Sequence, residues 1–126
     1  MEDPPVNVLL IEDDHDILEM YRIKLELDGY RVSVAENGET GLSEAARLQP
    51  DIIFLDVKLP GMDGFEVLAA LRERPETADT PVIFLSNYGE SELVDRGMGL
   101  GANEFLIKAK TTPSSLSEGI SEWLRE

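Results

Sequence analysis

The sequence predicts an α/β fold, in which a doubly wound parallel sheet of five strands has helices on both faces. Short apolar runs rich in β-branched and aromatic residues are typical of buried strands in a parallel sheet. Four such runs occur, at residues 8–11, 52–55, 82–85 and 105–107. Segments with helical spacing of apolar residues alternate with them, as is typical of βαβ units with right-handed crossovers. The 126 residues suffice for one domain with a hydrophobic core but not for two.

The first half of the chain predicts two strands, each followed by a helix. After the first apolar run, residues 16–27 place apolar side chains at helical spacing. Residues 30–35 alternate apolar with polar side chains, which indicates a half-exposed strand. The Asn-Gly pair at 37–38 predicts a turn. A helix then runs through residues 42–46 and ends by Pro50, because the residue before a proline disfavours helical backbone.

The middle of the chain predicts a strand, a loop, a helix and a further strand. Residues 51–55 form the third strand, and the segment 56–64, which contains Pro and Gly, forms a loop. Residues 65–74 predict a helix whose apolar side chains lie mostly on one side. Pro81 opens the fourth strand, where its missing N–H does least harm.

The last part of the chain predicts a weak helix, a strand and a strong helix. Glycines interrupt residues 90–100, and because an interior glycine costs about 0.5–1 kcal/mol relative to alanine, we expect a short or frayed helix. Residues 103–107 form the fifth strand. Thr112 suits a helix N-cap and Pro113 the first helical position. The apolar stripe of this last helix consists of Leu116, Ile120, Trp123 and Leu124.

The composition excludes several classes of site and partner. The chain has no cysteine, which excludes disulfides and thiolate metal sites. No apolar stretch is long enough to cross a bilayer and the N-terminus has no signal-peptide pattern, so we expect a cytoplasmic protein. The net charge of −15 disfavours nucleic acid and anionic membranes as partners, since binding to nucleic acid depends on Lys and Arg.

Polar side chains follow the apolar strands, at the carboxyl ends where ligands of open α/β sheets bind. Asp13 and Asp14 follow the first strand, Asp56 the third, Ser86 the fourth and Lys108 the fifth. Three carboxylates in one crevice repel one another unless a cation offsets their charge. Mg²⁺ takes oxygen ligands and usually one or two carboxylates, which leaves another carboxylate free as a nucleophile. The sequence therefore predicts a magnesium-dependent phosphoryl site.

Each of these side chains also has an ordinary structural explanation. Asp14 suits a helix N-terminus, where the helix dipole favours carboxylates, and Asp56 suits a turn. A lysine at a strand end is usually a solvated edge residue, and a single serine commonly caps a turn. The agreement among four strand ends favours a phosphoryl site over four separate explanations.

Five motifs occur in a fixed order along the chain. They are Leu10-Ile11-Glu12-Asp13-Asp14, Leu55-Asp56, Pro60-Gly61-Met62-Asp63-Gly64, Phe84-Leu85-Ser86 and the segment from Gly101 to Lys108. Together they resemble the receiver (phosphoacceptor) domain of two-component response regulators. The resemblance covers nearly the whole chain and implies a flavodoxin-like (βα)5 fold with strand order 2-1-3-4-5. It implies a single receiver domain over residues 1–126, with its core from about 6 to 125, that acts as a switch and is not an enzyme.

The resemblance implies a role for each residue of the site. Asp56 is the phosphoacceptor, which receives a phosphoryl group from a histidine kinase, a histidine phosphotransfer protein or a small phosphodonor. Asp14, Asp56 and the backbone carbonyl of Lys58 are implied to bind Mg²⁺ directly, and Asp13 to hold it chiefly through water. Lys108 is implied to bind a phosphoryl oxygen.

The resemblance also implies a switch that changes partner binding. Ser86 binds a second phosphoryl oxygen and shifts toward it, and Phe105 turns inward as Ser86 moves. Contacts that exist only in the phosphorylated state can bias a two-state loop toward one conformation. The likeness places the docking surface within residues 90–123 and leaves the downstream protein partner unknown, with a homodimer among the candidates.

The chain departs from the family pattern at positions around the site. Ala109 stands where the family usually has a proline joined by a cis bond. Because a cis bond before a residue other than proline costs about 2.5–4 kcal/mol, we predict a trans bond and a rearranged loop over residues 109–112. Asn87 is larger than the usual residue at its position and narrows access to the phosphoacceptor. The bulky Lys58 and Tyr88 predict slow self-dephosphorylation.

Three other functions compete with a phosphorylated receiver domain. A receiver-like interaction module that is never phosphorylated would retain the fold. A phosphohydrolase with an Asp nucleophile typically has an acid–base Asp two residues after it, where this chain has Lys58. A flavodoxin-like flavin binder would need a first loop that accepts the flavin phosphate, and the acidic first loop repels it.

Overall fold

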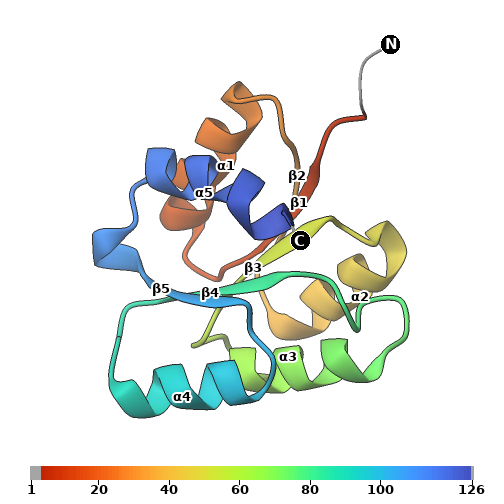
Figure 1. Cartoon of the computed structure of the whole chain (residues 1–126), viewed down its shortest axis with the longest axis vertical. Coiled ribbons are helices and arrows are strands. Elements are labelled where there is room, and N and C mark those ends of the chain that lie inside the picture. The colour runs from red at the N-terminus through yellow and green to blue at the C-terminus, as the bar shows by residue number, and fades with distance from the viewer. Residues whose placement is uncertain (1–3, 126) are drawn as a thin grey trace.

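The computed structural model describes residues 4–125 and confirms the predicted fold (Figure 1). Five parallel strands form one sheet in the order β2-β1-β3-β4-β5, as predicted. The elements in chain order are β1 (Asn7–Ile11), α1 (His15–Leu27), β2 (Arg31–Ala35), α2 (Gly38–Leu48), β3 (Ile52–Asp56), α3 (Gly64–Glu73), β4 (Val82–Ser86), α4 (Ser91–Gly99), β5 (Glu104–Ile107), the 3₁₀ turn η1 (Lys108–Lys110) and α5 (Pro113–Leu124).

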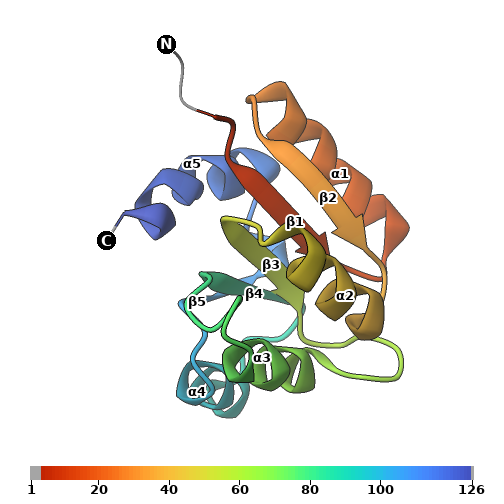
Figure 2. The ribbon, with the colours of Figure 1, turned by 90° about the vertical axis from the view of Figure 1, so that its right-hand side faces the viewer.

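Helices cover both faces of the sheet (Figures 1 and 2). α1 and α5 pack against one face, and α2, α3 and α4 against the other. Side chains of a strand alternate between the two faces, so that Leu10 and Phe54 belong to the core under α1 and α5. Leu9, Leu55 and Phe84 belong to the core over α2, α3 and α4. The parity of a residue in its strand therefore tells which helical layer it faces.

The register of the strands brings their carboxyl ends to one edge of the sheet. Ile11 of β1 lies beside Leu55 of β3, and Asp56 lies beside Leu85 of β4. Ser86, the last residue of β4, pairs with Ile107 of β5. The residues that directly follow these strands thus lie at the same level.

Side-chain caps set the starts of the helices, and two predicted boundaries need correction. Asp14 accepts hydrogen bonds from the backbone N–H groups of Asp16 and Ile17, so α1 begins at His15, one residue earlier than predicted. The predicted turn at Asn37 is instead the N-cap of α2, because the Asn37 side chain accepts from Thr40 N at 2.8 Å. Asparagine suits both structures, since its side chain can bond the backbone in either.

α4 is short, as the glycines predict. It has nine residues and no side-chain hydrogen bond at its N-cap, Glu90. Gly97 is buried against the sheet. An ideal Cβ built on Gly97 would lie 3.0 Å from the Phe84 ring and 3.2 Å from that of Phe105. The glycine therefore weakens the helix but lets α4 lie close to β4 and β5.

The connection from β5 to α5 differs from an extended loop. Lys108–Lys110 form one 3₁₀ turn, and Thr112 then caps α5 by accepting from Ser115 N at 3.0 Å. No cis peptide bond occurs between residues 4 and 125, which confirms the predicted trans bond before Ala109. Within the same residues, no helix combines the length and apolar character that crossing a bilayer requires.

Candidate functional site

Three charged side chains from the ends of β1, β3 and β5 share one face of the sheet. Glu12 follows Leu10 by two positions, Asp56 follows Phe54, and Lys108 follows Leu106. Leu10 and Phe54 belong to the core under α1 and α5, and the half-buried Leu106 packs against it. Because side chains alternate along a strand, the charged residues continue the same face and meet at the sheet edge.

Lys108 connects the two buried carboxylates. Its Nζ lies 2.6 Å from Glu12 Oε1 and 3.0 Å from Asp56 Oδ2. All three side chains are about 7% exposed. Backbone N–H groups satisfy the remaining oxygens, since Asp14 N donates to Glu12 Oε2 at 3.0 Å and Lys58 N donates to Asp56 Oδ1 at 3.3 Å. The geometry holds a lysine ammonium directly against the predicted phosphoacceptor.

Burial controls the ionisation of this group. Burial raises the pKa of Glu12 to about 7, although the Lys108 ammonium opposes the shift. Burial also raises the pKa of Asp56, again against the pull of Lys108. For Lys108, burial alone would lower the pKa, but the ion pairs with the two carboxylates outweigh it and the pKa rises. The ammonium therefore stays charged at neutral pH, and a second cation would stabilise both carboxylates as anions.

A group of three carboxylates at this edge could hold a metal ion. Ligand oxygens of Glu12, Asp13 and Asp56 all lie within 4.8 Å of one another. Asp13 is exposed while the other two are buried. Hard oxygen ligands around an open position suit Mg²⁺, which keeps several waters. The donor set therefore fits the predicted metal.

Asp14, predicted as a direct metal ligand, is placed differently. Its Oδ1 accepts from Asp16 N at 3.0 Å and from Ile17 N at 3.2 Å, as the N-cap of α1. It lies outside the group of three carboxylates that the structure brings together, and Glu12, which the prediction did not include, belongs to that group. The physical reason is the helix cap, because Glu12 continues the alternation of β1 toward Lys108 whereas the Asp14 carboxylate is bound to the first N–H groups of α1. That alternation is the signal in the sequence that could have identified Glu12.

The predicted modulating residues lie around the same opening. Lys58 Nζ lies 4.6 Å from the centre of the Tyr88 ring, a cation–π contact between the β3–α3 and β4–α4 loops. Tyr88 is 45% exposed. An open pocket of about 250 Å³ lies over the three carboxylates and beside these loops. It is lined by Glu12, Asp13, Asp14, Ile17, Asp56, Lys58, Asn87 and Lys108.

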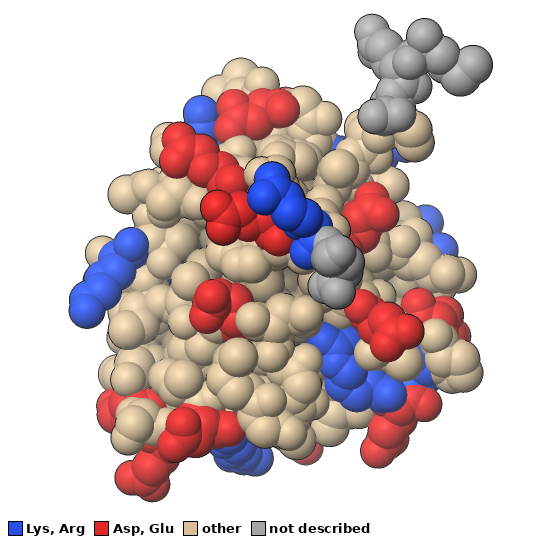
Figure 3. Space-filling model, viewed as in Figure 1, with Lys and Arg blue, Asp and Glu red and all other residues tan. Residues whose placement is uncertain are grey.

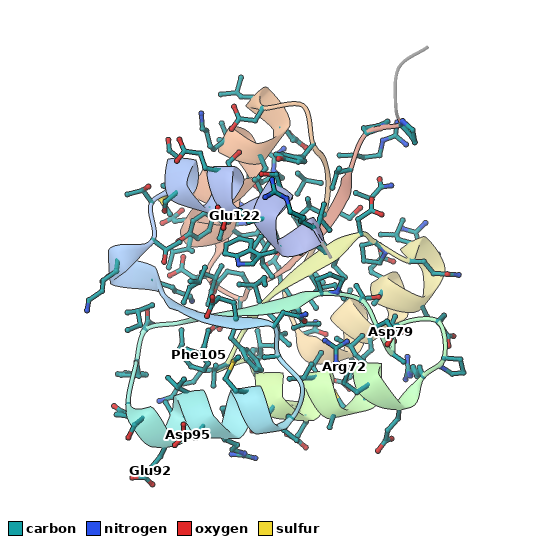
Figure 4. The ribbon with its side chains drawn as sticks, viewed as in Figure 1. Arg72, Asp79, Glu92, Asp95, Phe105 and Glu122 are labelled. Atoms are coloured by element: carbon teal, nitrogen blue, oxygen red, sulfur yellow. The ribbon has the colours of Figure 1, made fainter. Side chains whose placement is uncertain are left out.

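Ser86 and Phe105 lie on the opposite face of the sheet from Lys108. Ser86 is 1% exposed and its Oγ accepts from Tyr88 N at 3.1 Å. Phe105 is half-buried, lies between β5 and α4 in Figure 4, and tilts against Phe84 at a centroid distance of 5.6 Å. Phe105 packs against the core under α4, and Ser86 follows Phe84, a member of that core, by two positions. A displacement of Ser86 and a turn of Phe105 would therefore affect the same layer.

The fold and this site agree with comparisons to known proteins. The family model of the response regulator receiver domain matches residues 8–120. The chain belongs to this family. Receiver domains bind Mg²⁺ at an acidic pocket, interact with histidine kinases or phosphotransfer proteins, and are generally not catalytic enzymes.

Several relatives resemble this receiver domain over most of its length. The transcriptional regulator RpaA of Synechocystis sp. is 42% identical over 101 residues, which are 80% of this chain and 42% of that protein. PhoB of Rhizobium meliloti is 32% identical over 110 residues, 87% of this chain and 48% of that protein. The receiver domain thus spans less than half of each of these two relatives.

Solved structures show the same fold. The chemotaxis protein CheY4 of Vibrio cholerae superimposes with a TM-score of 0.89 at 29% identity, covering 94% of this chain and 98% of that one. A CheY-like receiver domain protein from Methanospirillum hungatei gives a TM-score of 0.88 at 27% identity, covering 96% and 94%. The five-stranded fold with this strand order is therefore that of the CheY-like receivers.

Proposed function

We propose that Asp56 accepts a phosphoryl group from the phosphohistidine of a histidine kinase or histidine phosphotransfer protein. The observation that carries the proposal is the Lys108 ammonium, which contacts both Asp56 and Glu12 inside a group of three carboxylates. One carboxylate would be enough to neutralise the charge of a buried lysine with a purely structural role. The excess of negative charge beside an accessible pocket favours a site for a divalent cation and a phosphoryl group.

The transfer requires little covalent chemistry from the protein. An oxygen of Asp56 forms the new bond to phosphorus as the bond from phosphorus to the leaving imidazole nitrogen breaks, and the imidazole keeps that electron pair. Lys108 stabilises the charge on the phosphoryl oxygens, since such transfers depend mainly on positioning and electrostatic stabilisation. Asp56 must be ionised to react, and the cations beside it favour that form.

Asp13 and Asp56 would bind Mg²⁺, with the backbone carbonyl of Lys58 as a further ligand, and the Glu12 carboxylate would add its negative charge beside the ion. The bound ion would neutralise charge shared by the phosphoryl group and the carboxylates. Asp13, the exposed member of the group, would bind the ion directly together with Asp56, while Glu12 and Lys108 stay paired beneath it. Asp14 is left to cap α1.

Phosphorylation would operate a switch on the α4 side of the sheet. The phosphoryl group would add a charge of about −1.5 to −2 at Asp56. Ser86, at the end of the neighbouring strand β4, would supply a hydroxyl to bind it. A Ser86 that moves toward the phosphoryl group would give up its bond to Tyr88 N. The space left beside Phe84 would then admit the Phe105 ring. These contacts exist in only one state, as a population shift requires.

Lys58, Asn87 and Tyr88 would control access to the phosphoryl group. The contact between Lys58 and the Tyr88 ring ties together two loops beside the pocket, and Asn87 lines it. Water must pass these side chains to hydrolyse the aspartyl phosphate, so we propose slow self-dephosphorylation.

The output of the switch would be read on the face formed by α4, β5 and α5, which faces the viewer in Figures 3 and 4. Glu92 and Asp95 project from α4 and Glu122 from α5, and all three are exposed. Carboxylates are spread over this view of the surface (Figure 3). Such a face repels nucleic acid, so we propose a protein as the downstream partner.

One experiment tests the proposed phosphorylation. The protein is incubated with Mg²⁺ and acetyl phosphate and weighed by mass spectrometry. We expect one phosphoryl adduct, which disappears in Asp56→Asn and when EDTA removes the metal. Asp51→Asn is the matched control, because Asp51 immediately precedes the same strand, at the opposite edge of the sheet. It should be phosphorylated like the wild type.

The competing functions give different results in the same experiment. Continuous release of phosphate over many turnovers would indicate a phosphohydrolase. A protein that gains no adduct, with acetyl phosphate or with a phosphorylated phosphotransfer protein, would be an interaction module that works without phosphorylation. Either result would end the proposal of a phosphoacceptor.

A further inference from the structure

Tyr21 is a buried residue that connects α1 to the turn carrying Lys108. Its side chain is 2% exposed in the core under α1 and α5. Its Oη donates a hydrogen bond of 2.8 Å to the backbone carbonyl of Thr111, which lies 90 residues later in the chain. A buried tyrosine usually finds such a partner, but this one reaches a backbone group next to the functional site.

The turn from Lys108 to Thr111 has few other constraints. Thr111 N donates to the Lys108 carbonyl at 3.1 Å, and Thr111 Oγ1 donates to the Ile107 carbonyl at 2.8 Å. Ala109 and Lys110 are exposed, and neither is a proline that would restrict the backbone. The bond from Tyr21 is thus a long-range tie that fixes the turn against α1.

Tyr21 also lies close to the charged group itself. Together with Glu12 and Asp56 it lines a small cavity beneath the site. Burial raises the pKa of the Tyr21 hydroxyl, so that it remains a hydrogen-bond donor at neutral pH. A continuous set of bonds therefore runs from Tyr21 to the Thr111 carbonyl, from Thr111 N to the Lys108 carbonyl, and from Lys108 Nζ to the carboxylates.

We propose that Tyr21 is a positioning residue for Lys108: its hydroxyl holds the β5–α5 turn so that the ammonium meets the phosphoryl group at Asp56. This inference rests on the proposed phosphoacceptor function. Tyr21 does not touch the phosphoryl group and acts through the backbone of the turn. Without the hydroxyl, the buried Thr111 carbonyl loses its partner, and a buried polar group without one favours rearrangement.

The test compares two tyrosines in the same layer. Tyr21→Phe removes only the hydroxyl, and we expect the limiting rate of phosphorylation at saturating Mg²⁺ and acetyl phosphate to fall about five- to tenfold, because small displacements of a positioned group lower rates strongly. Tyr30→Phe is the control. Tyr30 packs against the same core, and its hydroxyl makes no hydrogen bond within residues 4–125. Its rate should equal that of the wild type.

A second measurement separates positioning from a general loss of structure. The ammonium of Lys108 is followed by NMR through its ¹⁵Nζ and ¹³Cε signals in protein without phosphodonor. We expect these signals to shift in Tyr21→Phe and to stay in place in Tyr30→Phe, while Mg²⁺ affinity is retained in both. A structural role alone would lower stability without moving the Lys108 signals.

The outcomes are distinct. If the wild type is not phosphorylated, the proposed function fails. If the wild type is phosphorylated and Tyr21→Phe reacts at the same rate, or reacts slowly with unchanged Lys108 signals, the positioning role is overturned. Should Tyr21→Phe not fold, Thr111→Val removes the second bond of the turn at nearly constant shape. We expect it to lower the rate about threefold, and an unchanged rate would likewise overturn the inference.

Discussion

The face toward which a strand-end side chain points decides its role in this receiver domain. Glu12, Asp56 and Lys108 continue the face covered by α1 and α5 and form one ion-paired group. By the same alternation, Ser86 follows Phe84 on the opposite face, where Phe105 packs. Under the proposed function, the ends of β1, β3 and β5 would carry the charge chemistry and the end of β4 the response to it, so that a reaction on one side of the sheet would be read on the other.

The first prediction distinguishes two neighbouring aspartates. Asp13→Asn should weaken Mg²⁺ binding at least about tenfold, because it removes a proposed ligand. Asp14→Asn should leave the affinity unchanged, since asparagine caps a helix as well as aspartate does. Asp14→Ala should lower the free energy of unfolding by about 1 kcal/mol through loss of the cap, again without affecting Mg²⁺.

Isothermal titration with Mg²⁺ and urea unfolding measure these two effects separately. A larger loss of Mg²⁺ affinity in Asp14→Asn than in Asp13→Asn would return the metal role to Asp14. Equal losses would mean that the loop after β1 binds as a unit and that the cap geometry changes when the ion enters.

The site shows how far residue patterns predict geometry. Four strand-end runs correctly predicted that Asp56 and Lys108 meet, since the carboxyl ends of parallel strands share an edge. Roles within the acidic run Glu12-Asp13-Asp14 were harder to predict, because charge alone does not distinguish three adjacent carboxylates. Strand parity distinguishes Glu12 from Asp13, and only the capping hydrogen bond distinguishes Asp14 from Glu12. The bond from Tyr21 to Thr111 has no local signal, since it joins residues 90 positions apart.

At the scale of elements, α4 combines weak helix propensity with close packing. Gly97 lies under the rings of Phe84 and Phe105, whereas a Cβ on Gly99 would meet nothing within 4 Å. Both glycines therefore lower the helix propensity of α4, but only Gly97 is needed for close packing against the sheet. A helix held in place by close packing and not by its own propensity would be suited to respond to the proposed turn of Phe105.

The second prediction uses these glycines as a matched pair. Gly99→Ala should stabilise the protein by about 0.5–1 kcal/mol, because alanine is the better helix former. Gly97→Ala should destabilise it by about 1 kcal/mol, because overpacking against two rings outweighs the same gain. Urea unfolding measures both. If the two substitutions stabilise equally, α4 does not pack on the rings as closely as the structure shows.

The third prediction concerns the tie between α1 and α5. The Asp28 carboxylate accepts a hydrogen bond from Ser117 and pairs with Lys24 at 3.2 Å. The bond from Ser117, aided by Lys24, lowers the pKa of Asp28 below its ordinary value of 3.8. A lowered pKa contributes stability above the ordinary value, and this stability is lost as the pH falls through the folded-state pKa.

Asp28→Asn should therefore be less stable than the wild type at about pH 7, and the difference should be smaller at a pH well below 3.8, because protonation of the native carboxylate removes this contribution. Urea unfolding at the two pH values measures it. Ser117→Ala removes the same hydrogen bond and should show the same trend. A difference that is independent of pH would mean that Asp28 acts through its shape or its place at the end of α1, and not through its charge.

The elements themselves were largely predictable, and the exceptions have a common cause. Apolar runs predicted four of the strands, since buried parallel strands need continuous apolar residues, and the alternation of apolar and polar residues predicted the half-exposed β2. The starts of helices were less certain, because Asn37 and Asp14 can serve a turn, a ligand set or a cap with the same side chain. The side chain forms a cap only if the backbone N–H groups of the next three residues point toward it. Their direction is set by the folded chain and not by the local sequence.

At the scale of the whole molecule, the charge of the site matches the ion that it would bind. Glu12, Asp13 and Asp56 carry three negative charges when ionised, and Lys108 offsets one of them. The remaining charge of about −2 equals in size that of one Mg²⁺. A surface with a net charge of −15 adds a long-range attraction for cations and a repulsion for polyanions. Stability, metal binding and phosphorylation should therefore depend on one another through Lys108.

The fourth prediction follows from this balance. Lys108→Met should lower the free energy of unfolding in EDTA at about pH 8 by about 3 kcal/mol, because it leaves two buried carboxylates without their cation. The same variant should bind Mg²⁺ more tightly than the wild type and gain more stability from it, since three negative charges then face the ion. It should nevertheless be phosphorylated much more slowly, because the phosphoryl oxygens lose their positive contact. The control is Lys110→Met, because Lys110 is an exposed lysine of the same turn. This variant should match the wild type in stability, Mg²⁺ affinity and phosphorylation rate. Weaker Mg²⁺ binding in Lys108→Met would show that the lysine organises the carboxylates instead of competing with the ion for their charge.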